Sequence, residues 1–229
     1  MRIQLAQTYH YVGADRWVLF GIANCQLFAF VQADSRKRVQ RLYWVQFEGY
    51  LPSMPRLQHE YRSTRHATLA GMDFYVDTWF DRNDAARVPS PDLRALEAWV
   101  RAKGYSVPKG INTGSDEQHI TALLHSAGYT LPPEMMSVRL VHLLDGKRKE
   151  LMIIYSQDLA STGLTIEELR KGGRDYARWS RIEQRLIERA ETSMSMRIES
   201  APSPQTPATV RKSTCEASAS KMPFSVIAV

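Results

Sequence analysis

Aromatic and acidic side chains alternate with apolar ones along two segments that have the pattern of β-strands. In residues 42–50, alternate positions hold Leu42, Trp44, Gln46, Glu48 and Tyr50, and the positions between them hold Tyr43, Val45 and Phe47. In residues 72–80, one set holds Asp73, Tyr75, Asp77 and Trp79, and the other holds Phe74, Val76 and Phe80. Since successive side chains of a strand point to opposite faces, each strand has one apolar face and one face that combines rings with carboxylates.

If the two mixed faces belong to one concave sheet, they form a groove that suits a sugar or a cationic ligand. The predicted ligand-binding residues are Trp44, Gln46, Glu48, Asp73, Tyr75, Asp77 and Trp79. The alternative is an amphipathic sheet whose outer face is wet or is covered by a helix.

The same carboxylates offer general acid–base chemistry. A glycoside hydrolase, for example, needs two carboxyl groups at a defined separation. Asp73 and Asp77 are separated by roughly 13 Å of extended chain, which is too far for direct cooperation. A hydrolase would therefore need Glu48 to lie close to one of them, and we assign no catalytic residue.

A row of arginines near the end of the chain is the second candidate surface. On a helix with about 100° per residue, five arginines fall within an arc of roughly 80°: Arg174, Arg178, Arg181, Arg185 and Arg189. Guanidinium groups bind phosphate and carboxylate in a bidentate manner, so the row predicts an anion-binding face. The alternative is a solvated face on which neighbouring glutamates such as Glu188 pair with the arginines.

Two basic turns, at residues 36–38 and 147–149, add to the anion-binding interpretation. Basic side chains at such tips can contact a phosphate backbone, although exposed turns are commonly basic. A nucleic-acid or acidic-protein partner is therefore the second functional hypothesis.

Other chemistries are not predicted. The histidines lack the spacing of metal ligands, and neither phosphate-loop pattern occurs. Cys25 lies in an apolar run and Cys215 in a polar segment, which does not fit a disulfide framework. We expect no metal and no cofactor.

Composition is that of an ordinary globular protein. The 229 residues are 44% hydrophobic and 24% charged, with a net charge of +6. No apolar run approaches the roughly 18 residues that a membrane span needs, and the N-terminus lacks a secretory pattern. We expect a cytoplasmic protein without a membrane partner, and make no prediction of oligomeric state.

The elements that must position these residues form an α+β fold. Strand patterns at 27–33 and 39–50 form one hairpin, those at 138–144 and 150–155 form another around Asp145–Gly146, and 72–80 is an additional strand. Helices are predicted from about 91, from 115 with a Ser115–Gln118 capping box, and from about 165 with a break at Gly172–Gly173. We expect an antiparallel sheet with helices packed on one face.

The chain is predicted to form one domain over residues 1–191. Residues 192–229 are rich in Pro, Ser, Thr and Ala, a composition that buries too little apolar area to offset its ordering entropy, and we predict a disordered tail. Its apolar end, 224–229, is expected to be a frayed terminus, with strand addition to a partner's sheet as the alternative. The favoured function is a non-enzymatic binding protein with a small-molecule groove on the aromatic–acidic sheet face.

Overall fold

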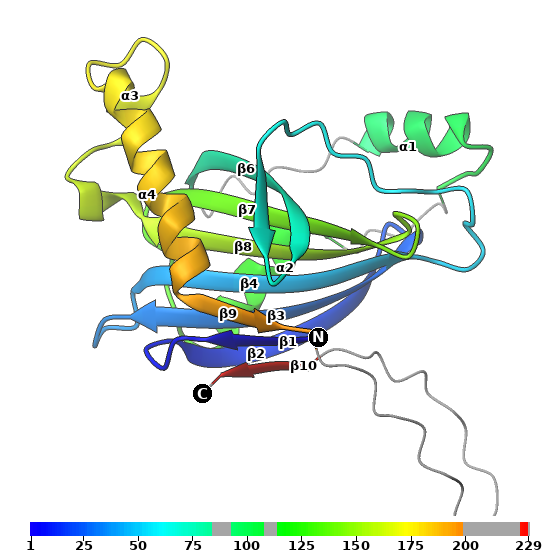
Figure 1. Cartoon of the computed structure of the whole chain (residues 1–229), viewed down its shortest axis with the longest axis horizontal. Coiled ribbons are helices and arrows are strands. Elements are labelled where there is room, and N and C mark those ends of the chain that lie inside the picture. Colours follow the sequence, from blue (N-terminus) through cyan, green and yellow to red (C-terminus); the bar gives the residue numbers. More distant parts are fainter. Residues whose placement is uncertain (84–92, 108–113, 199–224, 229) are drawn as a thin grey trace, which may run out of the picture.

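The computed structural model describes residues 1–83, 93–107, 114–198 and 225–228. Seven antiparallel strands form one large sheet in the order β2-β3-β4-β8-β7-β6-β5 (Figure 1). They are β2 (His10–Leu19), β3 (Ala23–Ala33), β4 (Val39–Tyr50), β8 (Lys149–Asp158), β7 (Glu134–Leu144), β6 (Met72–Arg82) and β5 (His66–Leu69). A small sheet, β10-β1-β9, is formed by Ser225–Ala228, Arg2–Leu5 and Met194–Arg197. The α+β class is confirmed.

Both predicted hairpins and the additional strand are present. The β3–β4 turn is closed by Asp34, whose Oδ1 accepts hydrogen bonds from the backbone N–H groups of Arg36 and Arg38. At the β7–β8 turn, Asp145 and Gly146 have φ values of 51° and 61°, the left-handed backbone that an Asp-Gly turn provides. Strands β2 and β5 were not predicted.

Helix α4 (Trp179–Thr192) covers one face of the large sheet and crosses in front of it in Figure 1. Its buried residues Leu186, Ile187 and Ala190 pack into a core that contains Tyr43 and other apolar side chains of the strands. The Tyr43 hydroxyl donates a 2.6 Å hydrogen bond to the Ala190 carbonyl. This contact ties the end of the helix to the centre of the sheet.

The prediction that all helices pack on one face is wrong. Helix α2 (Asp116–Ser126) lies on the opposite face, behind the sheet in Figure 1, where Ile120 and Leu124 are buried against Leu27 and Trp44. That second face carries apolar side chains of its own along β3, β4 and β8. Their burial is worth about 25 cal/mol per Å², so both faces of the sheet require a cover.

The remaining helices are short. Helix α1 (Leu93–Ala102) buries Val100 in a third cluster with Phe20 and Leu57; the start predicted at 90–92 lies outside the described residues. Helix α3 (Ile166–Leu169) is followed by a turn and a 3₁₀ segment (Tyr176–Arg178), so the break at Gly172–Gly173 is confirmed. No helix within the described ranges is long and apolar enough to cross a membrane.

The predicted domain end at residue 191 is too early. Helix α4 continues to Thr192, and β9 pairs with β1 so that Met194 lies opposite Leu5 and is buried. Residues 192–197 therefore belong to the fold, because β9 covers the apolar side chains of β1. Strand β10 pairs with β1 in parallel, which places Ser225–Ala228 in the chain's own sheet, not in a frayed end. Residues 199–224 and 229 of the predicted tail lie outside the described residues.

Candidate functional site

The strand register places most of the predicted ligand-binding residues on one face of the large sheet. Trp44 on β4 lies opposite Ile154 on β8. Ile154 lies opposite Arg139 on β7, and Arg139 lies opposite Asp77 on β6. Strands are spaced by about 4.8 Å, so Trp44 and Asp77 are separated by about 14 Å. The two mixed strand faces therefore share one side of the sheet, but two strands lie between them.

The residues of β6 are engaged in contacts of their own. Asp77 forms a 2.8 Å ion pair with Arg139, and the exposed Asp73 pairs with His66. The ring nitrogen of Trp79 donates to Asp81, and Tyr75 stacks on Tyr61 at 5.6 Å between ring centroids. The approach of Asp73 or Asp77 to Glu48 that a hydrolase would need is not formed, because β8 and β7 lie between β4 and β6 and both aspartates are paired with other residues.

On β4, the predicted residues lie beside a carboxyl group that the sequence analysis missed. Glu48 lies directly opposite Glu150 of β8. Trp44 is buried under α2, and its Nε1 donates a 2.9 Å hydrogen bond to Oε1 of the buried Gln46. Like charges that face each other across two strands destabilise a sheet. This pair is therefore a costly arrangement for a purely structural site.

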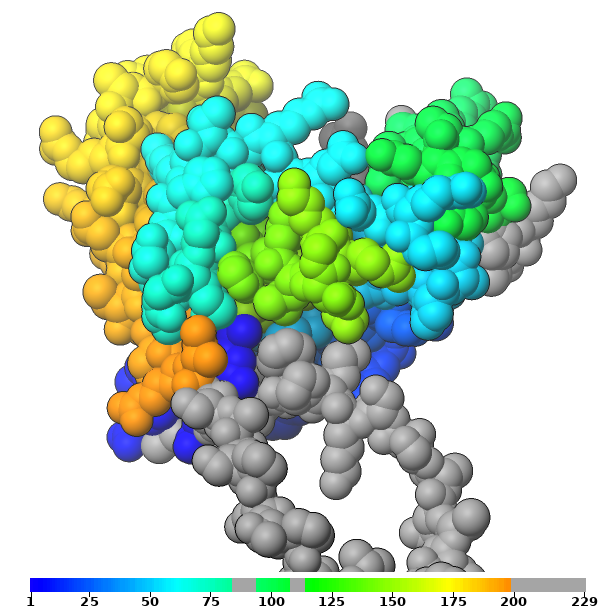
Figure 2. Space-filling model, turned by 45° about the vertical axis from the view of Figure 1, so that its right-hand side comes forward, coloured from blue at the N-terminus to red at the C-terminus, as the bar shows by residue number. Residues whose placement is uncertain are grey.

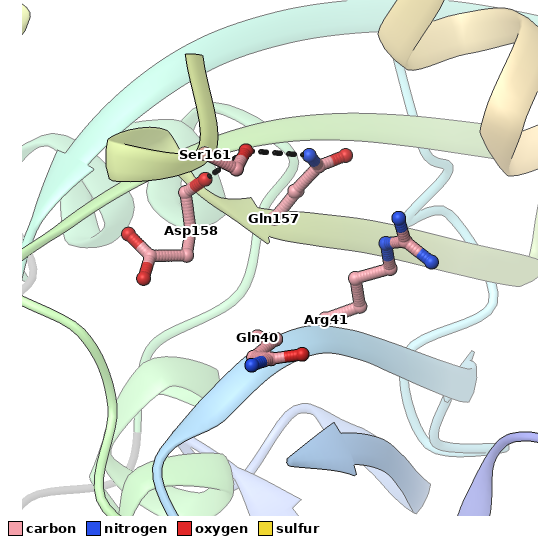
Figure 3. Close-up of a pocket in the computed structure, with 5 residues that line it drawn as sticks. All are labelled: Gln40, Arg41, Gln157, Asp158 and Ser161. Carbon is pink, nitrogen blue, oxygen red and sulfur yellow. Dashed lines mark hydrogen bonds between the residues drawn. The ribbon is translucent and has the colours of Figure 1, made fainter. Parts of the chain in front are cut away.

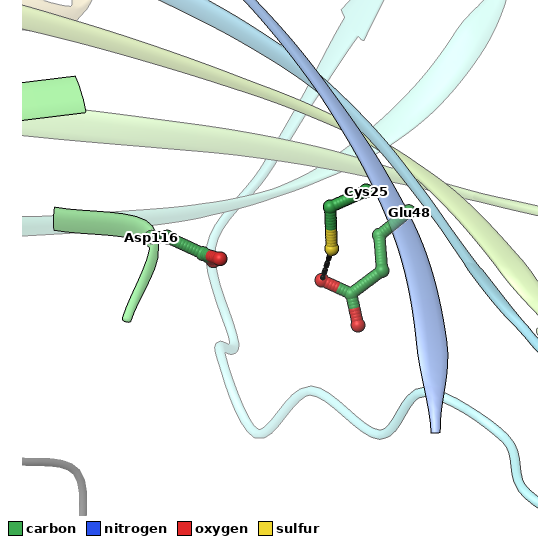
Figure 4. Close-up of side chains that lie close together, drawn as sticks. All are labelled: Cys25, Glu48 and Asp116. Atoms are coloured by element: carbon green, nitrogen blue, oxygen red, sulfur yellow. Dashed lines mark hydrogen bonds between the residues drawn. The ribbon is translucent and has the colours of Figure 1, made fainter. Parts of the chain in front are cut away.

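A thiol and a third carboxyl group complete the inner side of this cluster (Figure 4). Cys25 of β3 lies opposite Glu48, and its Sγ donates to Glu48 Oε2 over 3.6 Å. Asp116, the first residue of α2, points toward them from the other layer in Figure 4. One potential ligand atom from each of the three residues lies within 4.8 Å of the other two.

The outer side of the cluster is formed by the segment that follows β4. His59 Nδ1 lies 3.1 Å from Glu150 Oε2, and the Tyr61 hydroxyl donates a 2.8 Å hydrogen bond to the same oxygen. The backbone N–H of His59 donates to the Lys147 carbonyl. His59 also stacks on Tyr50 at 4.4 Å between ring centroids. These contacts hold His59 and Tyr61 against the carboxyl pair.

The environment shifts the protonation of every group in the cluster. Removal from water, with the charge of Glu150 adding to it, raises the pKa of Glu48 well above 4.5. Burial raises the pKa of Glu150 to about 7 and that of Asp116 to about 6. Burial also lowers the pKa of His59 to about 4, so its contact with Glu150 is a hydrogen bond of the neutral ring at neutral pH.

The charge of Arg139 acts on this cluster without an ion pair and offsets part of the rise in the pKa of Glu150 and Asp116. Among the described residues, no Lys or Arg side chain forms an ion pair with Glu48, Asp116 or Glu150, and Arg139 is paired with Asp77. Seven buried side-chain polar atoms lack a hydrogen bond in the described part of the chain. Five of them lie on this side of the sheet: Trp17 Nε1, Gln46 Nε2, His59 Nε2, Asp116 Oδ1 and Arg139 Nε. Since buried polar groups are normally paired, this concentration makes the cluster the candidate functional site.

A cavity of about 460 Å³ adjoins the outer side of the cluster and has His59 in its wall. Figure 2 shows the surface of α1, in green, close to the cyan surface of the segment that follows β4. The volume is within the range of small-molecule sites, about 300–1,000 Å³. The lining residues are Tyr50, Gln58, His59, Glu60, Tyr61, Arg62, Ala95, Leu96 and Trp99.

A second cavity, of about 330 Å³, lies where β4 begins and β8 ends (Figure 3). Gln157 Nε2 donates a 2.7 Å hydrogen bond to Ser161 Oγ, and Asp158 forms a 3.0 Å ion pair with Arg38. Arg41 Nη1 donates to Gln32 Oε1. Because these polar groups already have partners, this cavity shows less need of a ligand than the carboxyl cluster.

The predicted arginine row is not continuous. Helix α4 begins at Trp179, so Arg174 lies in the preceding turn, where it pairs with Glu168 and Asp175. Arg178 also pairs with Asp175, and Arg189 Nη1 donates a 2.8 Å hydrogen bond to Gln157 Oε1. Arg181 and Arg185 are exposed and form no ion pair with any residue that the structure describes.

The basic turns are used within the fold. Lys37 Nζ donates to the Ala127 carbonyl, and Arg38 pairs with Asp158. Arg148 donates hydrogen bonds to the carbonyls of Tyr50, Leu51 and Met54. The Arg148 contacts anchor the segment after β4, and three of the basic turn residues therefore have partners within the fold.

Comparison with known proteins adds no functional information. No family model matches the chain, and no curated protein or solved structure matches it either. Function must therefore be inferred from the geometry of the site.

Proposed function

We propose that this protein is a non-enzymatic binding protein for a small organic cation. Its ammonium group would lie against Glu150, with Glu48 behind, and its apolar part would lie in the cavity of about 460 Å³. The observation that carries the proposal is the pair of facing carboxyl groups, the half-buried Glu48 and the buried Glu150, which has no ion-paired Lys or Arg among the described residues and which adjoins an aromatic cavity.

The charge of the site favours a cation over an anion or a neutral ligand. Glu48, Asp116 and Glu150 are grouped on one face, and burial makes their ionised forms unfavourable. An ionised carboxylate that is buried without a partner is costly. A bound ammonium group would provide both the opposite charge and hydrogen-bond donors. Only a cationic ligand would then offset the cost of ionising the carboxyl groups, which would make the site selective for cations.

The cavity wall favours an ammonium ion attached to an apolar group. Tyr50, Tyr61 and Trp99 contribute aromatic rings, and the ring centroids of Tyr50 and Trp99 are 6.2 Å apart. Ring faces attract cations and also pack against apolar groups. An arylalkyl ammonium ion matches both parts of the site, with its ring between the aromatic side chains and its charge at Glu150.

Binding is supported better than catalysis by the state of the reactive groups. The pKa of the Cys25 thiol is raised by burial and by the nearby Glu48 carboxylate, and a protonated thiol is a poor nucleophile. The carboxyl pair proposed for a hydrolase, Glu48 with Asp73 or Asp77, is not formed.

Calorimetric titration with benzylammonium chloride and with benzyl alcohol tests the proposal. The two probes have similar shapes and differ in charge. At pH 8, where Glu150 is ionised, we expect benzylammonium to bind and benzyl alcohol to bind at least about tenfold more weakly, a difference of about 1.4 kcal/mol.

Glu150→Gln provides the matched variant, because it keeps the shape of the side chain and removes the charge. We expect it to weaken benzylammonium binding at least about tenfold, or about 1.4 kcal/mol. Glu188→Gln makes the same chemical change on the exposed face of α4 and should have no effect. Equal binding of the two probes, or an unchanged affinity in Glu150→Gln, would contradict the proposal.

A further inference from the structure

The inner side of the carboxyl cluster contains a sulfur atom that an organic cation does not require. Cys25 is 4% exposed and lies outside the lining of the cavity. Its Sγ is 3.6 Å from Glu48 Oε2, and Asp116 offers an oxygen within 4.8 Å of the ligand atoms of both residues. A cysteine sulfur and carboxylate oxygens are both among the donors that bind Zn²⁺ in proteins.

Rigid elements hold these three side chains. Cys25 and Glu48 are directly paired residues of two central strands. Asp116 lies within the capping box of α2, in which Gln118 N–H donates to Ser115 Oγ and Ser115 N–H donates to Gln118 Oε1. Helix α2 is in turn packed on the sheet through buried side chains. The positions of the donors are therefore set by secondary structure and not by a loop.

A buried amide without a partner points to the same place. Gln46 is fully buried, and its Oε1 accepts the hydrogen bond from Trp44, which orients the amide. Within the part of the chain that the structure describes, Gln46 Nε2 and Asp116 Oδ1 are both buried without a hydrogen-bond partner of normal geometry. Donors that orient carboxylate ligands around a metal are the usual second layer of such sites.

We propose that Cys25, Glu48 and Asp116 bind one divalent transition-metal ion of the zinc type. On binding, the thiol releases its proton to solvent and a metal–sulfur bond forms, while both carboxyl groups bind as carboxylates. A thiolate ligand selects zinc-like ions over Mg²⁺ and Ca²⁺, which prefer all-oxygen sites. Three protein ligands leave the fourth tetrahedral position for water or another small ligand.

This metal site goes beyond the proposed binding of an organic cation. The two sites share only Glu48, while Glu150, Tyr61 and the aromatic cavity remain available to the organic ligand. A metal ion that neutralises Glu48 and Asp116 leaves the charge of Glu150 in place. The two proposals can therefore fail separately.

Titration of the full chain with Co²⁺ tests the metal site, because Co²⁺ reports thiolate coordination by a charge-transfer band in the near ultraviolet. We expect one equivalent of Co²⁺ to produce the band, Zn²⁺ to abolish it by displacement, and excess Mg²⁺ to leave it unchanged. Cys25→Ser should eliminate the band, and Cys215→Ser, the matched control at the other cysteine of the chain, should retain it.

Asp116→Asn provides a second readout that does not depend on the thiol. We expect it to weaken Co²⁺ binding at least about tenfold while the band of the remaining complex persists. We also expect Zn²⁺ to raise the melting temperature of the wild-type chain and to have a much smaller effect on Asp116→Asn. Absence of the band in the wild type, or its loss in Cys215→Ser instead of Cys25→Ser, would overturn the proposal, whatever the outcome with benzylammonium.

Discussion

At the scale of single residues, the site depends on two glutamates that face each other across β4 and β8. Alternation along 42–50 correctly placed Trp44, Gln46 and Glu48 on one face of their strand. Alternation gave no information on Glu150, because the partner of a strand is chosen by contacts between segments about a hundred residues apart. Asp116 was missed for the same reason, since a capping pattern predicts where a helix begins and not what it faces.

Replacing Glu150 with Gln should reduce the pH dependence of stability. Burial raises the pKa of Glu150 from 4.5 to about 7, so the folded state holds this proton more tightly than the unfolded state. Its stabilising contribution is fully present below pH 4.5 and is lost as the pH rises through 7. In metal-free protein, we expect the wild type to lose on the order of 2 to 3 kcal/mol more than Glu150→Gln between pH 4.5 and 8.

Urea unfolding of both proteins across this pH range measures the effect. His59 contributes with the opposite sign, because its pKa falls from 6.5 to about 4 and its contribution is lost as the pH falls through this range. Both proteins retain His59 and Glu48, so the difference between their curves reports the titration of Glu150 together with its effect on the pKa of Glu48. Parallel curves would show that Glu150 has an ordinary pKa.

At the scale of elements, helix α2 decides the character of the aromatic–acidic face. The Ser115–Gln118 capping box was predicted and is present. The expectation of helices on a single face did not separate α2 from α4, because both faces of β4 carry apolar residues and only the packed structure shows which face each helix buries. The helix converts an outer sheet face into a buried one, which raises the pKa values at its N-terminal end.

Leu124→Ala should destabilise the protein because Leu124 is a buried anchor of α2. A buried Leu→Ala change costs about 2–5 kcal/mol. Thr121→Ala, on the exposed side of the same helix, should change stability by no more than about 0.5 kcal/mol. Chemical denaturation distinguishes the two. A small effect of Leu124→Ala would mean that α2 does not cover the sheet as described.

Helix α4 is a second element for which the local sequence pattern predicted the helix but not the arrangement of its side chains. A helix with a break was predicted here, but the five-residue arginine row is not formed, since the turn at Gly172–Gly173 removes Arg174 from the helix. Three of the five arginines have partners within the fold. The row therefore offers fewer free cations than the helical wheel indicates.

We expect the exposed pair Arg181 and Arg185 to make no productive contact with a nucleic acid. Affinity for a DNA duplex is measured against salt concentration for the wild type and for Arg181→Ala/Arg185→Ala. Each arginine that contacts a phosphate would contribute about 0.9 to the slope. Since we expect neither arginine to make such a contact, the slopes of the two proteins should be equal. A slope that falls by about 2 in the double variant would restore the anion-binding hypothesis.

At the scale of the whole molecule, the sequence predicted the α+β class and the two hairpins, because turn residues and alternation are local signals. It did not predict the small sheet, in which β1 is paired with β9 and β10 from the other end of the chain. Such pairing depends on tertiary contacts. The domain end at residue 191, which was predicted from composition, therefore excluded β9, the strand that lies opposite Ile3 and Leu5 of β1.

Truncation measures this boundary. A chain that ends at Ile198 retains β9, and we expect it to unfold cooperatively. A chain that ends at Ser193 loses the buried Met194 and the pairing of β9 with β1. Its melting temperature should be lower by at least about 5 °C, the shift expected for a loss of about 2 kcal/mol in a chain of this size. Equal melting temperatures would support the boundary at 191.

The most direct test of the central claim is tryptophan fluorescence during titration with benzylammonium chloride. Trp99 lines the cavity, Trp44 is buried beneath α2, and Trp79 lies on β6, which is separated from β4 by two strands. Binding beside Glu150 predicts saturable quenching that is lost in Trp99→Phe and retained in Trp79→Phe. Quenching that persists in Trp99→Phe and disappears in Trp79→Phe would place the ligand over β6 and contradict the site described here.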